Sequence, residues 1–166
     1  MEHSSSYPPV DWEKWEPNMR ATLLFIRRGQ EVLLMRKKRG LGAGKMNGPG
    51  GKIDPGETPA ECAVRETREE LCVTAFDPDH RGTLRFQFTD GLAIQCEVFT
   101  ATRFEGDPEE TEEGAPFWCA IDAIPYDQMW ADDPHWLPGV LAGKRFESWF
   151  VFEGESMLFH RIDWLG

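Results

Sequence analysis

The chain has 166 residues, 40% of them hydrophobic, which suits one domain with a substantial core. Its formal net charge of −11 argues against a nucleic-acid polymer as partner, because proteins that bind such polymers present basic faces. A single nucleotide remains compatible, since a divalent cation can bridge two acidic partners. No apolar run has membrane-spanning length and no signal peptide is evident. We therefore expect a cytoplasmic protein with no membrane contact.

The cysteines support a reducing compartment. They form no C-x-x-C pair, and two fall in or beside a predicted helix while two fall in strand-like segments. Buried free thiols are favoured over disulfides or a zinc site. The four residues are Cys62, Cys72, Cys96 and Cys119.

Residues 1–19 are expected to form an N-terminal extension to a single domain that spans residues 20–166. Pro8 and Pro9 break regular structure there, and the side chains of Trp12 and Trp15 are expected to pack back on the domain. The pattern assigns this extension no function. The domain then begins with an apolar hairpin, whose strands are Arg20 to Arg27 and Glu31 to Lys37.

The segment from Lys38 to Lys52 contains six glycines and one proline, which exclude a helix and predict a flexible loop. One interpretation is a surface linker. The other is a wall that faces a ligand, and this is favoured because the loop runs directly into an acidic helix. Gly50 could offer its carbonyl oxygen to a metal ion without steric cost.

The acidic helix begins with strong signals. Thr58 is a good N-cap, Pro59 suits the first helical position, and Glu61 completes a capping box. Glutamates then recur at i, i+3 and i+4, which places three carboxylates on one face, where they repel one another. Such a cluster suits Mg²⁺ or Mn²⁺ when a phosphate completes the coordination, although a solvated acidic face is the alternative. The three residues are Glu66, Glu69 and Glu70.

The remainder of the chain is rich in strands. Residues 73–76, 83–88, 92–101, 116–121, 145–152 and 156–163 have strand patterns, and the acidic tract 105–114 is a predicted loop. Asp133 and Pro134 are plausible as N-cap and first residue of a short helix that ends near Gly143, although Pro138 weakens that prediction. Strands around two helices predict an α/β (α+β) fold, a sandwich around a mixed β-sheet.

The acidic helix carries a long motif. Gly51, Glu57, the pair Arg65-Glu66 and the pair Glu69-Glu70 match the signature G-x5-E-x7-R-E-U-x-E-E-x-G-U, where U is a bulky apolar residue. The chain therefore resembles the Nudix hydrolases, which cleave nucleoside diphosphates linked to another group. It departs from the signature at Thr67, in place of an apolar residue, and at Cys72, in place of glycine. We expect these departures to alter local stability and to leave the chemistry intact.

The resemblance is closest to the animal MutT-homologue type of Nudix hydrolase. Residues 38–52 and 124–138 resemble that type, and the similarity extends over about residues 20–163. It implies an α/β/α sandwich and hydrolysis of oxidised purine nucleoside triphosphates, such as 8-oxo-dGTP and 2-hydroxy-dATP, to nucleoside monophosphate and pyrophosphate. This reaction would sanitise the nucleotide pool.

The resemblance also implies site residues. Mg²⁺ would be bound by the Gly50 carbonyl and by Glu66, Glu69, Glu70 and Glu113. Glu113 would be an additional ligand or the base that accepts a proton from water, with Glu112 adjacent in the same loop. Arg65 would orient the helix carboxylates through Glu57. The substrate-binding residues would be Thr22, Lys37, Leu41, Asn47, Phe86, Trp130, Asp132 and Asp133.

Within that set, Asn47 would hydrogen-bond the purine, Trp130 would stack on it, and Asp132 and Asp133 would face its hydrogen-bonding edge. Two adjacent carboxyls in an apolar pocket cannot both ionise cheaply, so one can stay protonated and donate a hydrogen bond.

The pocket departs from the family type at several positions. Leu41 and Ala21 replace aromatic residues, Ala131 replaces proline and Ile94 lies near an expected methionine. Selectivity for oxidised purines is therefore less secure than hydrolysis itself. Three alternatives remain: a Nudix activity on ADP-ribose, dinucleoside polyphosphates or methylated purine nucleotides; a non-catalytic nucleotide-binding domain; and an acidic interaction protein. We expect a monomer.

Overall fold

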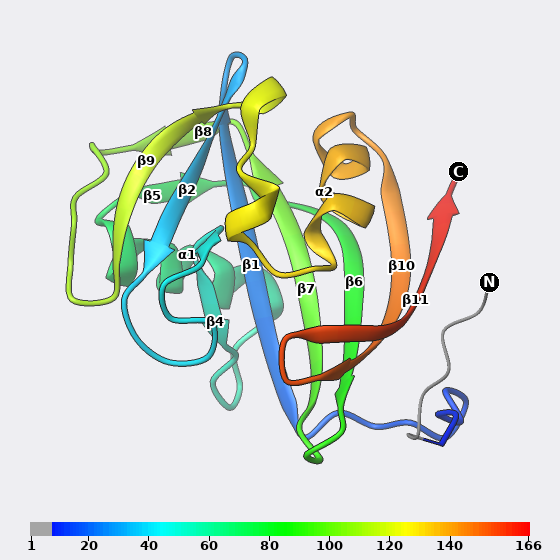
Figure 1. The fold of residues 1–166 in the computed structure, drawn as a ribbon. Helices are drawn as coiled ribbons and strands as arrows, with labels where there is room; N and C mark the ends of the chain where they lie inside the picture. The colour runs from blue at the N-terminus through cyan, green and yellow to red at the C-terminus, as the bar shows by residue number, and fades with distance from the viewer. Residues whose placement is uncertain (1–7) are drawn as a thin grey trace.

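The structure is a computed structural model that describes residues 8–166 (Figure 1). Residues 1–7 of the expected extension lie outside this range. The described chain contains two α-helices, two short 3-10 helices and eleven strands. Their bounds are β1 Met19–Arg28, β2 Glu31–Lys37, β3 Met46–Asn47, β4 Gly50–Lys52, α1 Pro59–Leu71, β5 Thr74–Phe76, β6 Asp79–Phe88, β7 Ala93–Ala101, β8 Arg103–Glu105, β9 Gly114–Ala120, η1 Ile121–Ala123, η2 Tyr126–Gln128, α2 Asp133–Leu141, β10 Arg145–Glu153 and β11 Ser156–Leu165.

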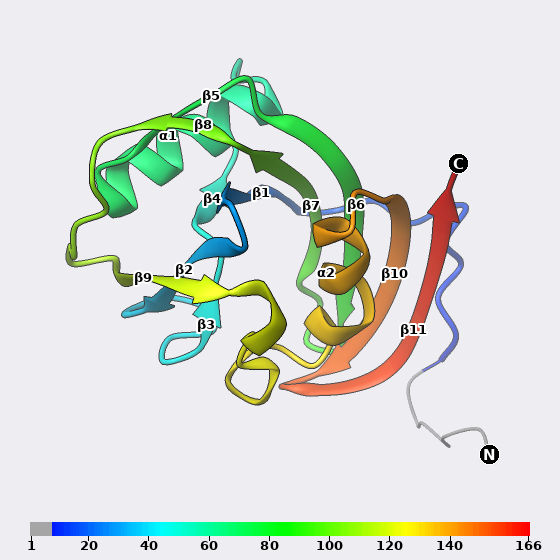
Figure 2. The ribbon, with the colours of Figure 1, turned by 90° about the horizontal axis from the view of Figure 1, so that it is seen from above.

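The main sheet is mixed, as the strand and helix pattern predicted. Its order is β11-β10-β6-β7-β1-β2-β3, with β4 paired to β1 and β9 paired to β2. The β1–β7 and β6–β10 pairs are parallel, and the other pairs are antiparallel. Strands β5 and β8 form a separate pair beside α1 (Figure 2).

Alternating side chains on β1 and β2 divide the core in two. Leu24 and Ile26 point toward α1, where they join Ala63 and Leu71. Phe25 points to the opposite side and packs against Trp136 of α2, with ring centroids 5.9 Å apart. The two helices therefore cover opposite faces of the sheet, and the expected sandwich is confirmed (Figure 2). Within residues 8–166, no helix is long and apolar enough to cross a membrane.

The start of α1 agrees with its sequence signals. Thr58 is the N-cap, and its hydroxyl accepts a hydrogen bond from the Glu61 amide at 3.1 Å. The Glu61 carboxylate accepts one from the Thr58 amide at 2.9 Å, which completes the capping box. Further along the helix, the hydroxyl of Thr67 is buried but donates to the Ala63 carbonyl at 2.8 Å. The hydroxyl that Thr67 introduces in place of an apolar side chain is therefore hydrogen-bonded within the helix.

The segment 38–52 is more ordered than a flexible loop. Strand β3 pairs with β2, and β4 pairs with β1 through Thr22–Gly51 and Leu23–Gly50. Close approach requires glycine at Gly50, where a Cβ would lie 1.9 Å from the Thr22 carbonyl oxygen. At Gly51 a Cβ would lie 2.6 Å from the Glu66 carboxyl carbon and would displace that side chain. The expectation of flexibility was wrong for this part of the segment, because its glycines allow tight packing.

The short helix α2 begins differently from the prediction. Asp132, and not Asp133, is the N-cap residue, and neither side chain makes a capping hydrogen bond. The Asp132 carboxylate instead accepts a hydrogen bond from the indole N–H of Trp136 at 2.8 Å. Pro138 lies inside the helix, which ends at Leu141.

The four cysteines are free, as expected, and Cys62, Cys96 and Cys119 are buried. Cys72 is exposed, so the expectation of burial was wrong there. It is the C-cap of α1 with φ of 63°, in the left-handed region. This is the position where glycine ends many helices, because glycine adopts this conformation without steric cost.

Replacing Cys72 by glycine is expected to stabilise the protein. A residue with a Cβ in the left-handed conformation destabilises the folded state by roughly 1–2 kcal/mol, and glycine removes this strain. The greater freedom of glycine in the unfolded chain offsets roughly 0.5–1 kcal/mol of that gain. The free energy of unfolding should rise by about 0.5–1 kcal/mol in urea denaturation. The control Cys72→Ala keeps the strain, so equal stability of the two variants would contradict this account.

Candidate functional site

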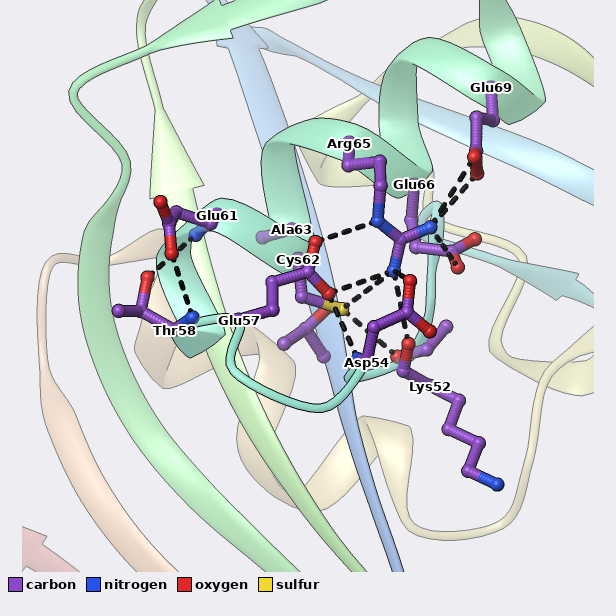
Figure 3. Close-up of polar contacts among 12 residues, drawn as sticks. Lys52, Asp54, Glu57, Thr58, Glu61, Cys62, Ala63, Arg65, Glu66 and Glu69 are labelled. Carbon is purple, nitrogen blue, oxygen red and sulfur yellow. Dashed lines mark hydrogen bonds and ion pairs between the residues drawn. The ribbon is translucent and has the colours of Figure 1, made fainter.

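The guanidinium of Arg65 organises the acidic face of α1 (Figure 3). It donates to both carboxylate oxygens of Glu57, at 2.7 and 2.9 Å, from the loop before the helix. Its remaining nitrogen reaches Glu66 at 3.0 Å and Glu69 at 2.9 Å. It also donates to the backbone carbonyl of Lys52 in β4 at 3.2 Å. One cation therefore offsets the repulsion within the carboxylate cluster and ties the loop, the helix and the sheet together.

This arrangement gives the acidic residues different proton affinities. The hydrogen bonds from Arg65 and the Asp54 amide lower the pKa of Glu57 to about 2. Burial raises the pKa of Glu66, although Arg65 opposes that rise. Burial also raises the pKa of Glu70, to about 7, against a hydrogen bond that its carboxylate accepts from the Gly50 amide at 2.8 Å. The most buried carboxylate on the helix is thus the one with the strongest need for a neighbouring positive charge.

Gly50 lies beside Glu70 as expected, but it contacts that carboxylate through its amide N–H. The sequence prediction concerned its carbonyl oxygen as a metal ligand. The metal-binding role of that carbonyl stays a prediction, because the amide hydrogen bond does not test it.

The acidic loop between β8 and β9 is fastened to the end of α1. The hydroxyl of Thr111 donates to the Glu70 carbonyl at 2.6 Å and accepts from the Glu113 amide at 3.1 Å. The Glu109 amide donates to the Leu71 carbonyl at 2.9 Å. The Glu113 side chain pairs with Arg39, whose Nε lies 3.0 Å from its carboxylate. The loop therefore brings Glu113 close to the helix, with its carboxylate held by an arginine.

The donor set has the chemistry of a site for a hard divalent cation. Carboxylate oxygens and backbone carbonyls are the ligands that Mg²⁺ and Mn²⁺ take, and Gly51 leaves room for the Glu66 carboxylate against β4. Within residues 8–166, no three acidic, histidine or cysteine side chains are arranged around one metal position. Arg65 and Arg39 hold the Glu66, Glu69 and Glu113 carboxylates instead.

A cavity of about 350 Å³ lies beside this cluster. Gly50 and Gly51 of β4 line it. The Gly50 amide also hydrogen-bonds Glu70, and Gly51 lies against the Glu66 carboxylate. All eight side chains that the sequence predicted to bind substrate lie around this cavity: Thr22, Lys37, Leu41, Asn47, Phe86, Trp130, Asp132 and Asp133. The structure thus brings them together from five separate segments.

Several of these side chains have fixed positions. The Trp130 ring packs edge-on against Phe88 and Phe152, with centroids 6.2 and 5.7 Å away. Phe86 stacks on Phe150 at 5.2 Å. The Asn47 side-chain oxygen accepts a hydrogen bond from the Gly48 amide at 2.9 Å.

The other predicted side chains differ in exposure. Leu41 is 49% exposed at the rim, whereas the buried hydroxyl of Thr22 contacts the Cys62 sulfur at 3.3 Å.

Sequence reasoning missed part of the cavity wall. Phe88, Leu92 and Phe152 line the cavity but were not among the predicted residues. Leu84, Phe86 and Phe88 alternate along β6, so a period-two pattern that began from Phe86 would have identified Phe88.

The Asp132–Asp133 pair is deeply buried, at 2% and 4% exposure. Asp132 accepts the Trp136 hydrogen bond, whereas Oδ2 of Asp133 is buried without a partner. Burial raises the pKa of Asp132 to about 6, and burial with the charge of Asp132 raises the pKa of Asp133 well above its ordinary value. Near neutral pH the pair therefore retains a proton and presents both a hydrogen-bond donor and an acceptor.

This burial predicts a pH dependence of stability. The folded pair holds protons that the unfolded chain, with aspartate near pKa 3.8, releases. The free energy of unfolding should therefore fall as pH rises from about 4 through 6. Asp133→Asn removes one titrating group and supplies an N–H for Asp132, so the variant should gain stability over wild type as pH rises, by roughly 1–3 kcal/mol at pH 8.

Urea denaturation without added metal at several pH values measures this effect. Asp127→Asn, at an exposed acid in η2, is the control and should follow the wild-type curve. If the free energies of unfolding of wild type and Asp133→Asn changed in parallel with pH, the raised pKa values of the buried pair would be contradicted.

The comparisons with known proteins identify the family of this chain. Residues 17–140 match the NUDIX domain model. The oxidized purine nucleoside triphosphate hydrolase of Danio rerio is 42% identical and that of Mus musculus 37%, covering 86% and 82% of this chain and 92% and 88% of theirs. The mutator MutT protein of Bacillus halodurans superimposes with a TM-score of 0.79 at 28% identity, over 87% of this chain and 97% of that structure. The chain therefore belongs to the Nudix hydrolase family, whose members use divalent metal ions and act on small nucleotides.

Proposed function

We propose that this Nudix hydrolase cleaves oxidised purine nucleoside triphosphates, such as 8-oxo-dGTP and 2-hydroxy-dATP, to the nucleoside monophosphate and pyrophosphate, and so sanitises the nucleotide pool. The names of the Danio rerio and Mus musculus relatives support this substrate class. The observation that carries the proposal is the buried Asp132–Asp133 pair in a cavity that adjoins the acidic helix through Gly50 and Gly51.

The Asp132–Asp133 pair suits an oxidised purine because it offers one donor and one acceptor. Oxidation of guanine at C8 or of adenine at C2 changes which ring atoms carry hydrogens, and a pair with a movable proton can adapt to either pattern. Trp130, held by Phe88 and Phe152, would stack on the base, and Asn47 would hydrogen-bond it.

The phosphates would lie toward α1. Lys37 lines the cavity, and its charge acts on both Glu70 and Glu113, which places a cation between the two parts of the site. We propose Glu66, Glu69, Glu70, Glu113 and the Gly50 carbonyl as the residues that would hold Mg²⁺, with Mn²⁺ as a substitute. When bound, the metal would neutralise phosphate charge and orient a water for in-line attack.

Proton transfer would fall to the carboxylates. Glu70 and Glu113 are the two candidates to accept a proton from water. Arg65 would hold Glu66 and Glu69 in place through its bidentate contact with Glu57.

The remaining expectations are proposals of the same kind. Residues 20–166 would act as one catalytic domain, as a monomer, on free nucleotides and not on nucleic-acid polymers or at membranes. Four free thiols support a reducing, cytoplasmic location. Ala21 and Leu41 in the cavity wall favour a second candidate, a Nudix activity on another nucleotide, because they remove aromatic stacking surface.

A substrate panel tests the proposal. Product analysis with Mg²⁺ and 8-oxo-dGTP, 2-hydroxy-dATP, dGTP and ADP-ribose is expected to give the highest kcat/KM for the two oxidised triphosphates. Asp132→Asn and Asp133→Asn should each change the ranking of these substrates. A higher kcat/KM for dGTP or ADP-ribose in the wild-type protein would favour the second candidate.

The role of the acidic helix is tested by Glu70→Gln. The amide keeps an oxygen for the Gly50 N–H but loses the charge, so kcat should fall by about a hundredfold or more. Glu105→Gln, at an exposed acid in β8, is the matched control and should retain activity. A folded Glu70→Gln protein with wild-type kcat would exclude Glu70 from the metal site and from base catalysis.

A further inference from the structure

The segment before β1 is fastened to the turn between β6 and β7, residues 89–92. Asn18 makes three hydrogen bonds there. Its backbone N–H donates to the Ala93 carbonyl at 2.8 Å, and its side-chain oxygen accepts from the Ala93 backbone N–H at 2.8 Å. Its side-chain nitrogen donates to the Gly91 carbonyl at 2.9 Å. The start of β1 and this turn lie together at the lower end of the sheet in Figure 1. A single asparagine thus secures the last part of the turn.

Trp15 secures the other part of the turn. Its indole N–H donates to the Gln87 side-chain oxygen at 2.8 Å. The Gln87 side-chain nitrogen in turn donates to the Phe88 carbonyl at 2.8 Å and to the Leu92 carbonyl at 3.5 Å. Gln87 is therefore held in the orientation that bridges the two ends of the turn.

The same turn forms one wall of the cavity. Phe88 and Leu92 line it directly, and Met19 and Ile94, which follow the fastened residues in β1 and β7, line it too. The Phe88 ring also packs against Phe152 at 5.6 Å and against Trp130 at 6.2 Å. A shift of the turn would therefore move Phe88 and release the ring that Trp130 packs on.

We propose that Asn18 and Trp15 are positioning residues for nucleotide binding, which act through Phe88 and Leu92. The N-terminal segment would then influence which nucleotide is bound, although it lies outside the Nudix motif. Trp15 and Asn18 do not line the cavity themselves. The hydrogen bonds of both residues go to Gln87, Gly91 and Ala93 and not to the acidic helix, so we expect their effect at the base end of the site. The substrate class in this inference rests on the proposed function.

The test compares Asn18→Ala and Trp15→Phe with the wild-type protein. Trp15→Phe removes the indole N–H together with part of the ring. Trp12→Phe is its matched control, because it makes the same change in the ring that packs against Trp15, 5.5 Å away, and leaves the bond to Gln87 in place. The measurements are KM and kcat for 8-oxo-dGTP and dGTP, the half-saturating Mg²⁺ concentration, and hydrogen exchange of residues 88–93.

Asn18→Ala and Trp15→Phe should raise KM for the preferred nucleotide about threefold, the size of a lost hydrogen bond, with kcat within about twofold of wild type. The preference between 8-oxo-dGTP and dGTP should fall, exchange at residues 88–93 should be faster, and the Mg²⁺ requirement should not change. Trp12→Phe should match the wild type.

The inference is overturned if both variants keep the wild-type KM and preference. It is also overturned if kcat falls equally for every nucleotide, because that would show a general structural defect. If Asn18→Ala does not fold, Trp15→Phe against Trp12→Phe decides. If the wild type prefers another nucleotide, the proposed function fails, and the KM for that nucleotide still tests the positioning role.

Discussion

The contact between Arg65 and the acidic residues around it is the interaction on which the site depends. A guanidinium that is bidentate to Glu57 and also reaches Glu66, Glu69 and the Lys52 carbonyl fixes three segments at once. Without it, the helix carboxylates would repel one another and the loop before α1 would lose its anchor. Because its pKa is raised far above the ordinary range by these partners, Arg65 is charged at every pH at which the protein is folded. In the proposed metal site, a divalent cation would share Glu66 and Glu69 with this arginine, which holds their carboxylates in place.

Strand β4 couples the acidic helix to the cavity. It has only three residues, and two of them are glycines: a side chain at Gly50 would clash with the Thr22 backbone, and one at Gly51 would displace the Glu66 carboxylate. The Gly50 amide contacts Glu70, while Gly50 and Gly51 line the cavity. The two halves of the site thus meet at a strand whose lack of side chains brings them within reach of one nucleotide.

Much of this arrangement could be predicted from the sequence, and the exceptions have physical causes. The N-terminus of α1 depends on local hydrogen bonds, so its capping box was readable from Thr58 and Glu61. Strand β4 was missed because glycine composition indicates a loop, whereas its pairing with β1 depends on residues almost thirty positions away. The N-cap of α2 was misplaced by one residue because the Asp133-Pro134 pair suggested a cap at Asp133, whereas Asp132 holds that position without a capping bond that the sequence would reveal. The Arg39 partner of Glu113 is likewise a long-range contact that no local pattern reveals.

The protein balances its two acidic clusters by different means, and under the proposed function this difference would orient the nucleotide. On α1, Arg65 balances the half-buried Glu66 and the exposed Glu69, and the charge of Lys37 acts on the buried Glu70. In the cavity, Asp132 and Asp133 are too buried for ions and keep a proton instead. A triphosphate placed at the buried pair would lose its solvation beside two acidic groups, whereas at the helix it would meet Lys37 and the proposed metal. The proposed function therefore favours one orientation of the nucleotide, with its base toward α2 and its phosphates toward α1.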